Sequence, residues 1–111
     1  MVVNAKGMFL GTKAATPAMR AADGKSIVYI SSIAGIGQAT TQEPAYAASK
    51  VAMRVFSKVT AAQHAKDNMR CNSVHPGLVD TVMFRAAFPT PVALDQRLSR
   101  VPMRRALSGV R

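Results

Sequence analysis

The sequence is poor in the features that mark secreted and membrane proteins. A single cysteine, Cys71, cannot form an internal disulfide, so the fold is not a cystine framework. No run approaches the about 18 apolar residues that a membrane-spanning helix needs. The longest uncharged stretch, residues 26–42, is interrupted by serine, threonine, glycine and glutamine. The N-terminus lacks the basic-then-apolar pattern of a signal peptide. We therefore expect a cytoplasmic protein with no membrane partner.

Acidic residues are also scarce. Five Asp and Glu stand against 15 Lys and Arg, which leaves a net charge of +10 and raises the question of a nucleic-acid partner. The basic residues are spread thinly until a C-terminal cluster of Arg97, Arg100, Arg104, Arg105 and Arg111. The Phe and Tyr residues do not alternate with this cluster, as base-stacking platforms would. The pattern favours a solvated basic tail, or an interface without its acidic partner, over a nucleic-acid site.

The expected elements alternate between helices and strands. Residues 3–22 are typical of a helix that Asn4 caps and Pro17 kinks or divides. Residues 26–31 suit a strand buried on both faces, and residues 32–42 a loop. A second helix follows over residues 44–66, with Pro44 in its first turn, and a second strand over residues 70–74. Beyond these, only residues 94–98 indicate a further helix. Strands joined through helices imply parallel pairing and an α/β fold.

Tyr46 and Lys50 stand four residues apart on the second expected helix, and hence on one face. A phenol releases its proton only near pH 10 in water, and a neighbouring cation favours the phenolate. The pair is therefore suited to proton transfer near neutral pH. The same spacing also arises by chance on amphipathic helices, so the pair alone indicates no function. The same helix carries an apolar stripe of Val51, Ala52, Val55, Phe56 and Val59.

Other motifs surround the pair. Ser32 ends the first expected strand, and α/β sheets bind ligands at the carboxyl ends of their strands. Together with these residues, four segments resemble the short-chain dehydrogenase/reductase family, in its single-domain alcohol/ketone branch. They are residues 3–7 (VNAKG), 27–35 (IVYISSIAG), 46–50 (YAASK) and 70–81 (RCNSVHPGLVDT), and the resemblance covers about residues 2–85.

The resemblance implies a hydride transfer between NAD or NADP and a secondary alcohol or ketone. Tyr46 would be the general acid/base, and Lys50 would assist it and bind the nicotinamide ribose. Ser32 would hold the reacting oxygen, rather than Ser31, because the family's serine is followed by x-x-Gly. Asn4 would hold a water of the proton relay.

The resemblance also places binding residues later in the chain. Pro76, Gly77, Val79 and Thr81 would line the nicotinamide, and Met83 and Phe84 fall where the family has its substrate lid, as does Phe88. His75 could touch cofactor or substrate, and Cys71 is typical of a small core residue. No cluster of His, Cys and acidic residues has metal-ligand spacing, so we expect no metal.

Parts of the family's pattern are missing. None of the glycines forms the turn that holds a pyrophosphate at a helix N-terminus, and the residue that selects NAD or NADP is absent. Residues 86–111 match poorly, with Arg104 in place of a glycine and no closing strand. We therefore expect one incomplete domain over residues 1–111. It would be a partial Rossmann-like, doubly wound parallel sheet, the catalytic half without the N-terminal Gly-rich βαβ unit.

These gaps leave several interpretations open. We expect little or no activity from the isolated chain, and a homo-oligomer, a dimer or tetramer, in the full-length form. A non-catalytic oligomerisation partner is one alternative, because the family's dimer contact uses the helices that carry Asn4 and Tyr46. A basic nucleic-acid binder and a reading frame from which no protein is made are the others.

Overall fold

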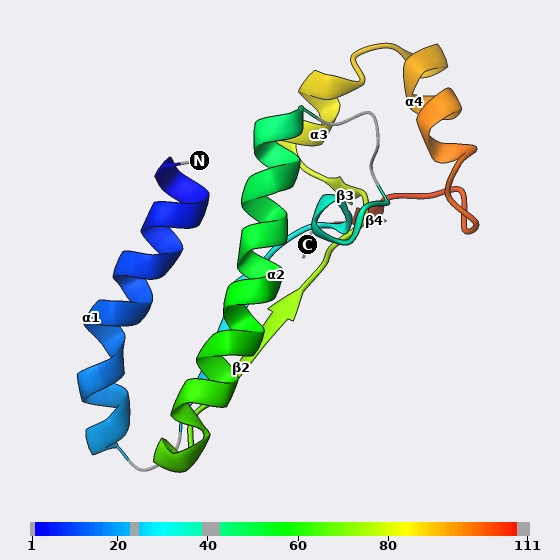
Figure 1. The fold of residues 1–111 in the computed structure, drawn as a ribbon. Helices are drawn as coiled ribbons and strands as arrows, with labels where there is room; N and C mark the ends of the chain where they lie inside the picture. Colours follow the sequence, from blue (N-terminus) through cyan, green and yellow to red (C-terminus); the bar gives the residue numbers. More distant parts are fainter. Residues whose placement is uncertain (1, 23–24, 39–42, 109–111) are drawn as a thin grey trace. The chain divides into compact units, whose positions relative to one another are not determined.

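The computed structural model describes residues 2–22, 25–38 and 43–108, and the chain forms two compact units that divide between His75 and Pro76. The first unit contains the π-helical turn η1 (Val2–Lys6), α1 (Gly7–Ala21), β1 (Ser26–Ile30), the 3-10 turn η2 (Ile33–Ile36), α2 (Pro44–His64), the 3-10 turn η3 (Ala65–Asp67) and β2 (Arg70–Val74). The second contains β3 (Val79–Asp80), α3 (Val82–Ala87), α4 (Pro91–Leu98) and β4 (Leu107–Ser108). Figure 1 shows these elements along the chain.

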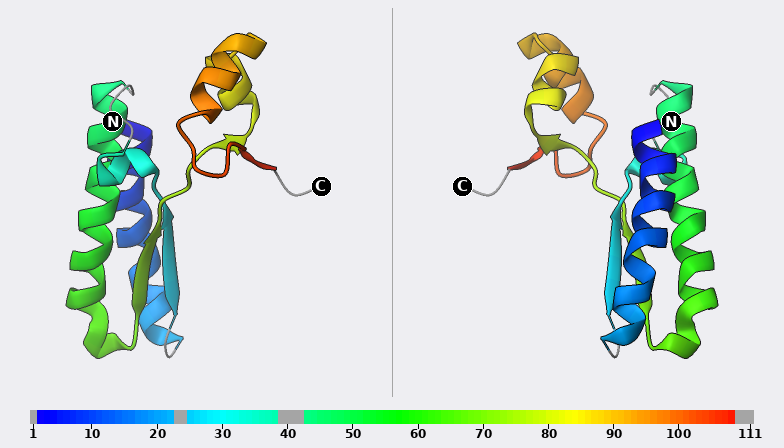
Figure 2. Two further views of the ribbon diagram at one scale, coloured as in Figure 1. Left: turned by 90° about the vertical axis from the view of Figure 1, so that its right-hand side faces the viewer. Right: turned by 90° about the vertical axis from the view of Figure 1, so that its left-hand side faces the viewer.

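In the first unit, β1 and β2 pair in parallel, with Ser26 opposite Arg70 and Ile30 opposite Val74. Both helices, α1 and α2, lie on the same face of this pair, as the two views of Figure 2 show. The sequence prediction of an α/β fold with parallel strands is therefore confirmed. Within residues 2–75 as described, no helix covers the opposite face, so the second helical layer of a doubly wound sheet is not seen there.

The expectation that β1 is buried on both faces is wrong. Val28 and Ile30 are 53% and 60% exposed, whereas Tyr29, which points to the other face, is buried. Successive side chains of a strand point to opposite faces, and the helices of this unit cover only one of them. The helices therefore cover the face of β1 that carries Tyr29 and leave uncovered the face that carries Val28 and Ile30.

The start of the first helix also differs from the sequence prediction. Asn4 does not cap it, because Asn4 lies inside η1 and its Nδ2 donates to Ser49 Oγ, 3.0 Å away on α2. Because the Asn4 side chain is bonded to the buried Ser49 hydroxyl, it does not cap the helix. The helix is not divided at Pro17, which lies within α1. The departure from α-helical geometry lies instead in the π-helical turn η1, directly before α1.

The remaining boundaries follow the sequence closely. Pro44 is the first residue of α2, which ends at His64 where the expected helix ended at residue 66. The expected loop over residues 32–42 contains the 3-10 turn η2, and residues 39–42 lie outside the described residues. Cys71 is half-buried, and burial raises the pKa of its thiol, which agrees with a core role.

Among the described residues, five polar side chains, all serine or threonine, are buried beside four hydrophobic ones. The ring of Phe56 on α2 packs against those of Phe9 and Tyr29, with centroids 6.1 and 6.0 Å apart. The Tyr29 phenol hydrogen-bonds Thr12 on α1, and burial raises the pKa of that phenol. In the described part of the chain, every buried side-chain polar atom has a hydrogen-bond partner, so these hydroxyls carry no desolvation penalty for an unpaired group. The buried polar side chains are Thr12, Ser31, Ser49, Ser57 and Thr60.

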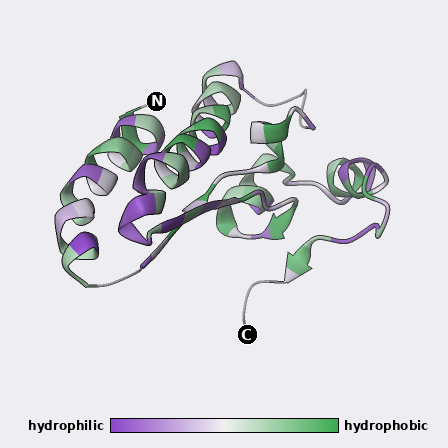
Figure 3. Ribbon diagram, turned by 60° about the horizontal axis from the view of Figure 1, so that its bottom comes forward, coloured by the Kyte–Doolittle hydropathy of each residue, from purple (hydrophilic) through white to green (hydrophobic). Residues whose placement is uncertain are grey.

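α2 buries a face different from its most apolar one. Ser49, Met53 and Ser57, one turn apart from one another, are buried, whereas Val51, Val55 and Val59 are exposed. Small hydroxyl side chains let the helix lie close to the strands, and Ser49 and Ser57 donate to carbonyls of their own helix. Figure 3 shows that hydrophobic and hydrophilic residues alternate along both helices. Phe9 and Leu10 on α1 are exposed, like the valines of α2.

The second unit contains structure that the sequence pattern did not indicate. β3 pairs in parallel with β4, with Val79 opposite Leu107, so the expectation of no closing strand is wrong. A two-residue strand carries no periodicity to detect, which is why it was missed. α3, also unexpected, begins where Thr81 Oγ1 accepts from Phe84 N, 3.2 Å away. α4 confirms the helix expected at residues 94–98.

Within the described ranges, no helix combines the length and the apolar character needed to span a bilayer.

A charged cluster joins the C-terminal end of α1 to η3 and supports a prediction on stability. Asp67 Oδ2 lies 2.7 Å from Arg20 Nε and 3.1 Å from His64 Nδ1. The pKa of the Asp67 carboxyl is held below its usual value, mainly by the hydrogen bond from Arg20 and next by the one from His64. Such a group stabilises the fold above its unfolded pKa of about 4, and this stabilisation is lost as the pH falls through the folded pKa.

We therefore expect Asp67→Asn to flatten the fall in the free energy of unfolding of the chain below about pH 4. Urea unfolding at a series of pH values measures this. Asp95→Asn, which removes an exposed carboxylate on α4, is the matched control. Equal pH slopes for the two variants would contradict a stabilising role of the cluster.

Candidate active site

Tyr46 and Lys50 lie together near the start of α2. Both carboxylate oxygens of Glu43 cap this helix, accepting from Ala45 N at 3.1 Å and from Tyr46 N at 2.8 Å. The cap sets where the helix begins, and so places Tyr46 in its first turn and Lys50 one turn later. Lys50 Nζ lies 5.6 Å from the centroid of the Tyr46 ring, in agreement with the shared face that their spacing predicts.

The Lys50 ammonium also reaches the carboxyl end of the sheet. Its Nζ donates to the carbonyl of Ile30, the last residue of β1, at 2.9 Å, and lies 3.9 Å from Met53 Sδ. An ammonium has three N–H donors, so the Ile30 carbonyl leaves donors for further oxygen ligands such as the hydroxyls of a ribose. The residues present therefore fit the ribose end of a nicotinamide cofactor.

The two serines that follow β1 have different surroundings. Ser31 is buried and its Oγ donates to Lys50 O at 2.8 Å, which occupies its hydrogen. Ser32 is half-buried, and its Oγ accepts from Ala34 N at 3.2 Å. Because this contact uses only an acceptor site, the Ser32 hydroxyl keeps its hydrogen for a ligand oxygen. The contacts therefore favour Ser32 over Ser31 as a ligand-binding hydroxyl.

Gly35 allows the turn that begins at Ser32 to lie against α2. A Cβ at this position would be 2.6 Å from Ser31 Oγ and 2.7 Å from Lys50 O. Any side chain would therefore push η2 away from the helix turn that carries Lys50.

Asn4 is attached to the same part of α2. Its Nδ2 donates to Ser49 Oγ, which is fully buried and in turn donates to Tyr46 O at 2.7 Å. The structure thus brings Asn4, Ser32, Tyr46 and Lys50 to one end of the first unit. His75 joins them through hydrogen bonds of its ring, 3.0 Å from Ser32 O and 3.0 Å from Ser73 Oγ. The sequence pattern indicates only a ligand contact for His75, although its place one residue after β2 puts it beside the end of β1.

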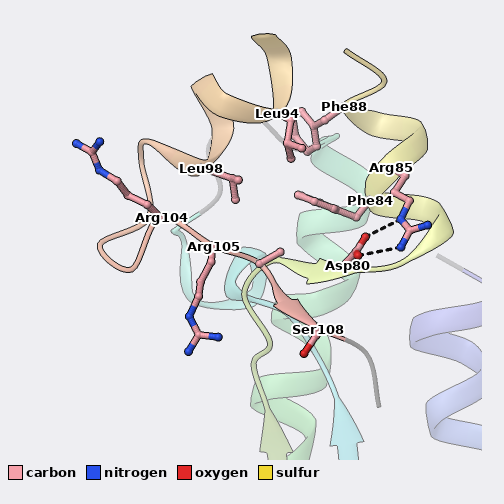
Figure 4. A pocket seen from close by; sticks show the side chains of 10 residues that line it. Asp80, Phe84, Arg85, Phe88, Leu94, Leu98, Arg104, Arg105 and Ser108 are labelled. Atoms are coloured by element: carbon pink, nitrogen blue, oxygen red, sulfur yellow. Dashed lines mark hydrogen bonds and ion pairs between the residues drawn. The ribbon is translucent and has the colours of Figure 1, made fainter. Parts of the chain in front are cut away.

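The other expected binding residues belong to the second unit. Val79 lies in β3, Thr81 caps α3, and Pro76 and Gly77 precede both. A cavity of about 480 Å³ in this unit is lined by the apolar side chains of Phe84, Phe88, Leu94 and Leu98 (Figure 4). Met83 does not line it and is exposed.

Charged side chains also line this cavity, namely those of Asp80, Arg85, Arg104 and Arg105. Arg85 pairs with Asp80 at 2.7 Å, which lowers the pKa of that carboxyl. Arg104 and Arg105 point outward in Figure 4. The cavity therefore combines an apolar wall with charged side chains. In the part of the chain that the structure describes, no group of three or more His, Cys, Asp or Glu side chains could hold a metal ion.

Curated relatives resemble most of this chain. It is 36% identical over 104 residues to 2-(R)-hydroxypropyl-CoM dehydrogenase from Xanthobacter autotrophicus, covering 94% of this chain and 41% of that protein. It is 43% identical over 89 residues to cyclopentanol dehydrogenase from a Comamonas species, covering 80% of this chain and 35% of the relative. The chain thus spans about two fifths of the length of these relatives.

Solved structures share the fold. A 3-oxoacyl-[acyl-carrier protein] reductase from Brucella melitensis with bound NAD has a TM-score of 0.82 and 31% identity, over 96% of this chain and 37% of the other. A Beutenbergia cavernae structure with bound NADP has a TM-score of 0.88 and 26% identity, over 96% of this chain and 42% of the other. These likenesses show a partial Rossmann-like fold. Residues 1–91 also match the model of the short chain dehydrogenase family. This chain, in which Tyr46 and Lys50 lie together, therefore belongs to that family.

Proposed function

We propose that this chain carries the proton-transfer and substrate-holding residues, the catalytic half, of an NAD(P)-dependent oxidoreductase that interconverts secondary alcohols and ketones. The observation that carries this proposal is the position of Lys50, whose Nζ contacts the Tyr46 ring and the carboxyl end of β1. Both relatives named above are dehydrogenases, one of a hydroxypropyl compound and one of cyclopentanol. These names support an alcohol as the substrate class.

Tyr46 is the general acid/base in this proposal. Its phenolate takes the hydroxyl proton during alcohol oxidation, and its phenol returns a proton to the oxygen during ketone reduction. The Lys50 ammonium lies over the Tyr46 ring, 5.6 Å from its centroid. A positioned group of this kind contributes roughly 10²–10⁴-fold to a rate.

Ser32 and Asn4 support that proton transfer. The Ser32 hydroxyl, oriented by the Ala34 N–H, donates to the reacting oxygen and so holds the substrate. The Asn4 amide nitrogen is fixed on Ser49, which leaves the side-chain oxygen Oδ1 of Asn4 to hold a water that connects Tyr46 with solvent. Both residues act from positions set by contacts with α2 or η2.

The cofactor would supply or accept the hydride when bound. Lys50 would bind the ribose hydroxyls through its remaining N–H donors, and Pro76, Gly77, Val79 and Thr81 would line the nicotinamide. Met83 and Phe84 would contact the substrate, with Phe84 contributing from the wall of an apolar cavity. The relatives' structures hold NAD in one case and NADP in another, so the proposal includes both cofactors.

The test compares the chain alone with a chimera. In the chimera, residues 1–91 replace the aligned segment of the Comamonas cyclopentanol dehydrogenase, which supplies the rest of the fold. We expect the chimera to form reduced nicotinamide with cyclopentanol, and the chain alone to give little turnover. A folded chimera that binds cofactor but oxidises no secondary alcohol would contradict the proposal.

We also propose that the complete protein is a homo-oligomer that uses the outer side of α1 and α2. Phe9 and Leu10 on α1 and Val51, Val55 and Val59 on α2 are exposed, and apolar patches of this kind mark interaction surfaces. This surface also supports a second candidate function, a non-catalytic oligomerisation partner, which predicts assembly that Tyr46→Phe does not change.

We expect Val55→Glu to shift the chain from oligomer to monomer in sedimentation analysis, because a buried glutamate would lose its hydration at the interface. Gln63→Glu adds the same charge at an exposed position near the end of α2 and should leave assembly unchanged. A wild-type chain that is monomeric at high concentration would contradict assembly through this surface.

A further inference from the structure

Beyond the last backbone hydrogen bond between β1 and β2, a side-chain hydrogen bond from His75 connects the two chain segments. The last ladder bond runs from Ser31 N to Val74 O, at 2.8 Å. In this register the next donor from the second strand would be the N–H of residue 76, and Pro76 has none. His75 Nδ1 lies 3.0 Å from the carbonyl oxygen of Ser32 instead. The imidazole thus connects the two chain segments one residue beyond the sheet.

The chemistry of this contact fixes which nitrogen carries the hydrogen. A carbonyl oxygen can only accept, so His75 Nδ1 must be the donor. The Ser32 carbonyl has two lone pairs and also accepts from Gly35 N at 2.9 Å, a bond within its own turn. The bond from His75 therefore adds a long-range attachment to a locally closed turn.

The other side of the imidazole leads to α2. His75 Nε2 lies 3.0 Å from Ser73 Oγ, and Ser73 Oγ hydrogen-bonds Ser57 Oγ at 3.2 Å. Ser57 is buried on α2, and its Oγ lies within hydrogen-bond distance of both Ser73 Oγ and the helix carbonyl of Arg54, 2.8 Å away. Since Ser73 gives its hydrogen to His75 Nε2, the single hydrogen of Ser57 completes the series when it points to Ser73. A continuous series of hydrogen bonds thus links the Ser32 main chain to the helix that carries Tyr46 and Lys50.

We propose that His75 is a positioning residue, which holds Ser32 at a set place relative to α2 so that the Ser32 hydroxyl and the Tyr46 phenol meet the same reacting oxygen. The inference rests on the proposed function, in which Ser32 holds that oxygen. Displacements of about 1 Å in such an arrangement can cost on the order of 10²-fold in rate, so one tether can matter without touching the substrate.

Two conservative variants separate the two nitrogens of the ring. The amide N–H of His75→Asn lies close to the place of Nδ1 and can still donate to Ser32 O. The amide of His75→Gln lies close to the place of Nε2 and can reach only Ser73. Both variants keep a polar side chain of similar size, and only His75→Asn keeps the contact with Ser32.

The first measurement is nuclear magnetic resonance of the chain itself. We expect the neutral His75 ring to carry its hydrogen on Nδ1, with its signals assigned by comparison with His64→Gln. We expect His75→Gln, and not His75→Asn, to shift the backbone amide signals of Ile33 and Gly35. A neutral ring with its hydrogen on Nε2, or equal shifts in both variants, would overturn the tether.

The second measurement is turnover in the dehydrogenase chimera. We expect His75→Gln to lower kcat by about 10-fold with an unchanged KM for the cofactor, and His75→Asn to stay within about twofold of wild type. Turnover that needs Tyr46 but is the same in both His75 variants overturns the positioning role. If the resonances behave as expected and the folded chimera with an unchanged His75 shows no turnover, the tether stands and the proposed function fails.

Discussion

Tyr46→Phe is expected to lower kcat by roughly 10²–10⁴-fold while leaving cofactor affinity within a small factor of wild type. The substitution removes only the phenol oxygen, the atom proposed to exchange a proton with the substrate. The ring remains in place on the first turn of α2, and Lys50 keeps its bond to the Ile30 carbonyl. The loss should therefore fall on the chemical step and not on binding.

Tyr29→Phe is the matched control, since it removes the same atom from the chain's other tyrosine. Tyr29 is buried and bonded to Thr12, so its loss should cost roughly 1 kcal/mol of stability and leave kcat unchanged. Steady-state assays of the chimera give kcat, and fluorescence titration with reduced nicotinamide gives affinity. The smallest expected loss of kcat is roughly 10²-fold. A Tyr46→Phe chimera whose kcat stays within about 10-fold of the unsubstituted chimera would therefore exclude Tyr46 as the acid/base.

Gly35→Ala is expected to destabilise the first unit by about 1–3 kcal/mol. The new methyl group would stand 2.6 Å from Ser31 Oγ and 2.7 Å from the Lys50 carbonyl, and the latter is backbone that cannot turn aside. η2 would have to move away from α2, and Ser32 at its start would move with it. We therefore expect lower kcat in the chimera as well as lower stability in the chain.

Gly11→Ala provides the opposite case. A Cβ at Gly11 meets nothing within 4 Å, and the residue lies inside α1. Alanine is the better helix former, so this variant should be stabilised by up to about 1 kcal/mol. Urea unfolding of both variants beside wild type measures the contrast. Equal stability of Gly35→Ala and wild type would mean that η2 does not lie against the helix as closely as described.

The order of elements was readable in the sequence because each one depends on local chemistry. Pro44 and the residues after it indicate the start of α2, and the β-branched run at residues 26–30 indicates β1. Two strands joined through a helix are expected to pair in parallel, which the register of β1 and β2 confirms. The Tyr46–Lys50 spacing predicted their shared face for the same reason, because a helix turn alone sets it.

The partners of each side chain were not readable in this way. Asn4 looked like a cap, but it bonds to a buried serine 45 positions along the chain. The valines of α2 formed the more apolar stripe, but the face with Ser49 and Ser57 is buried because small side chains allow close approach to the strands. β4 consists of two residues and exists because its partner β3 supplies the hydrogen bonds.

The sequence by itself thus determined the parallel α/β arrangement, the helix that carries Tyr46 and Lys50, and the family, since these follow from residue order, spacing and backbone preference. Only the tertiary structure decided which serine keeps its hydroxyl free, why Gly35 must be a glycine, and that His75 reaches Ser32. Those features depend on distances of about 3 Å between atoms far apart in the chain. Packing sets such distances, and no local pattern encodes them.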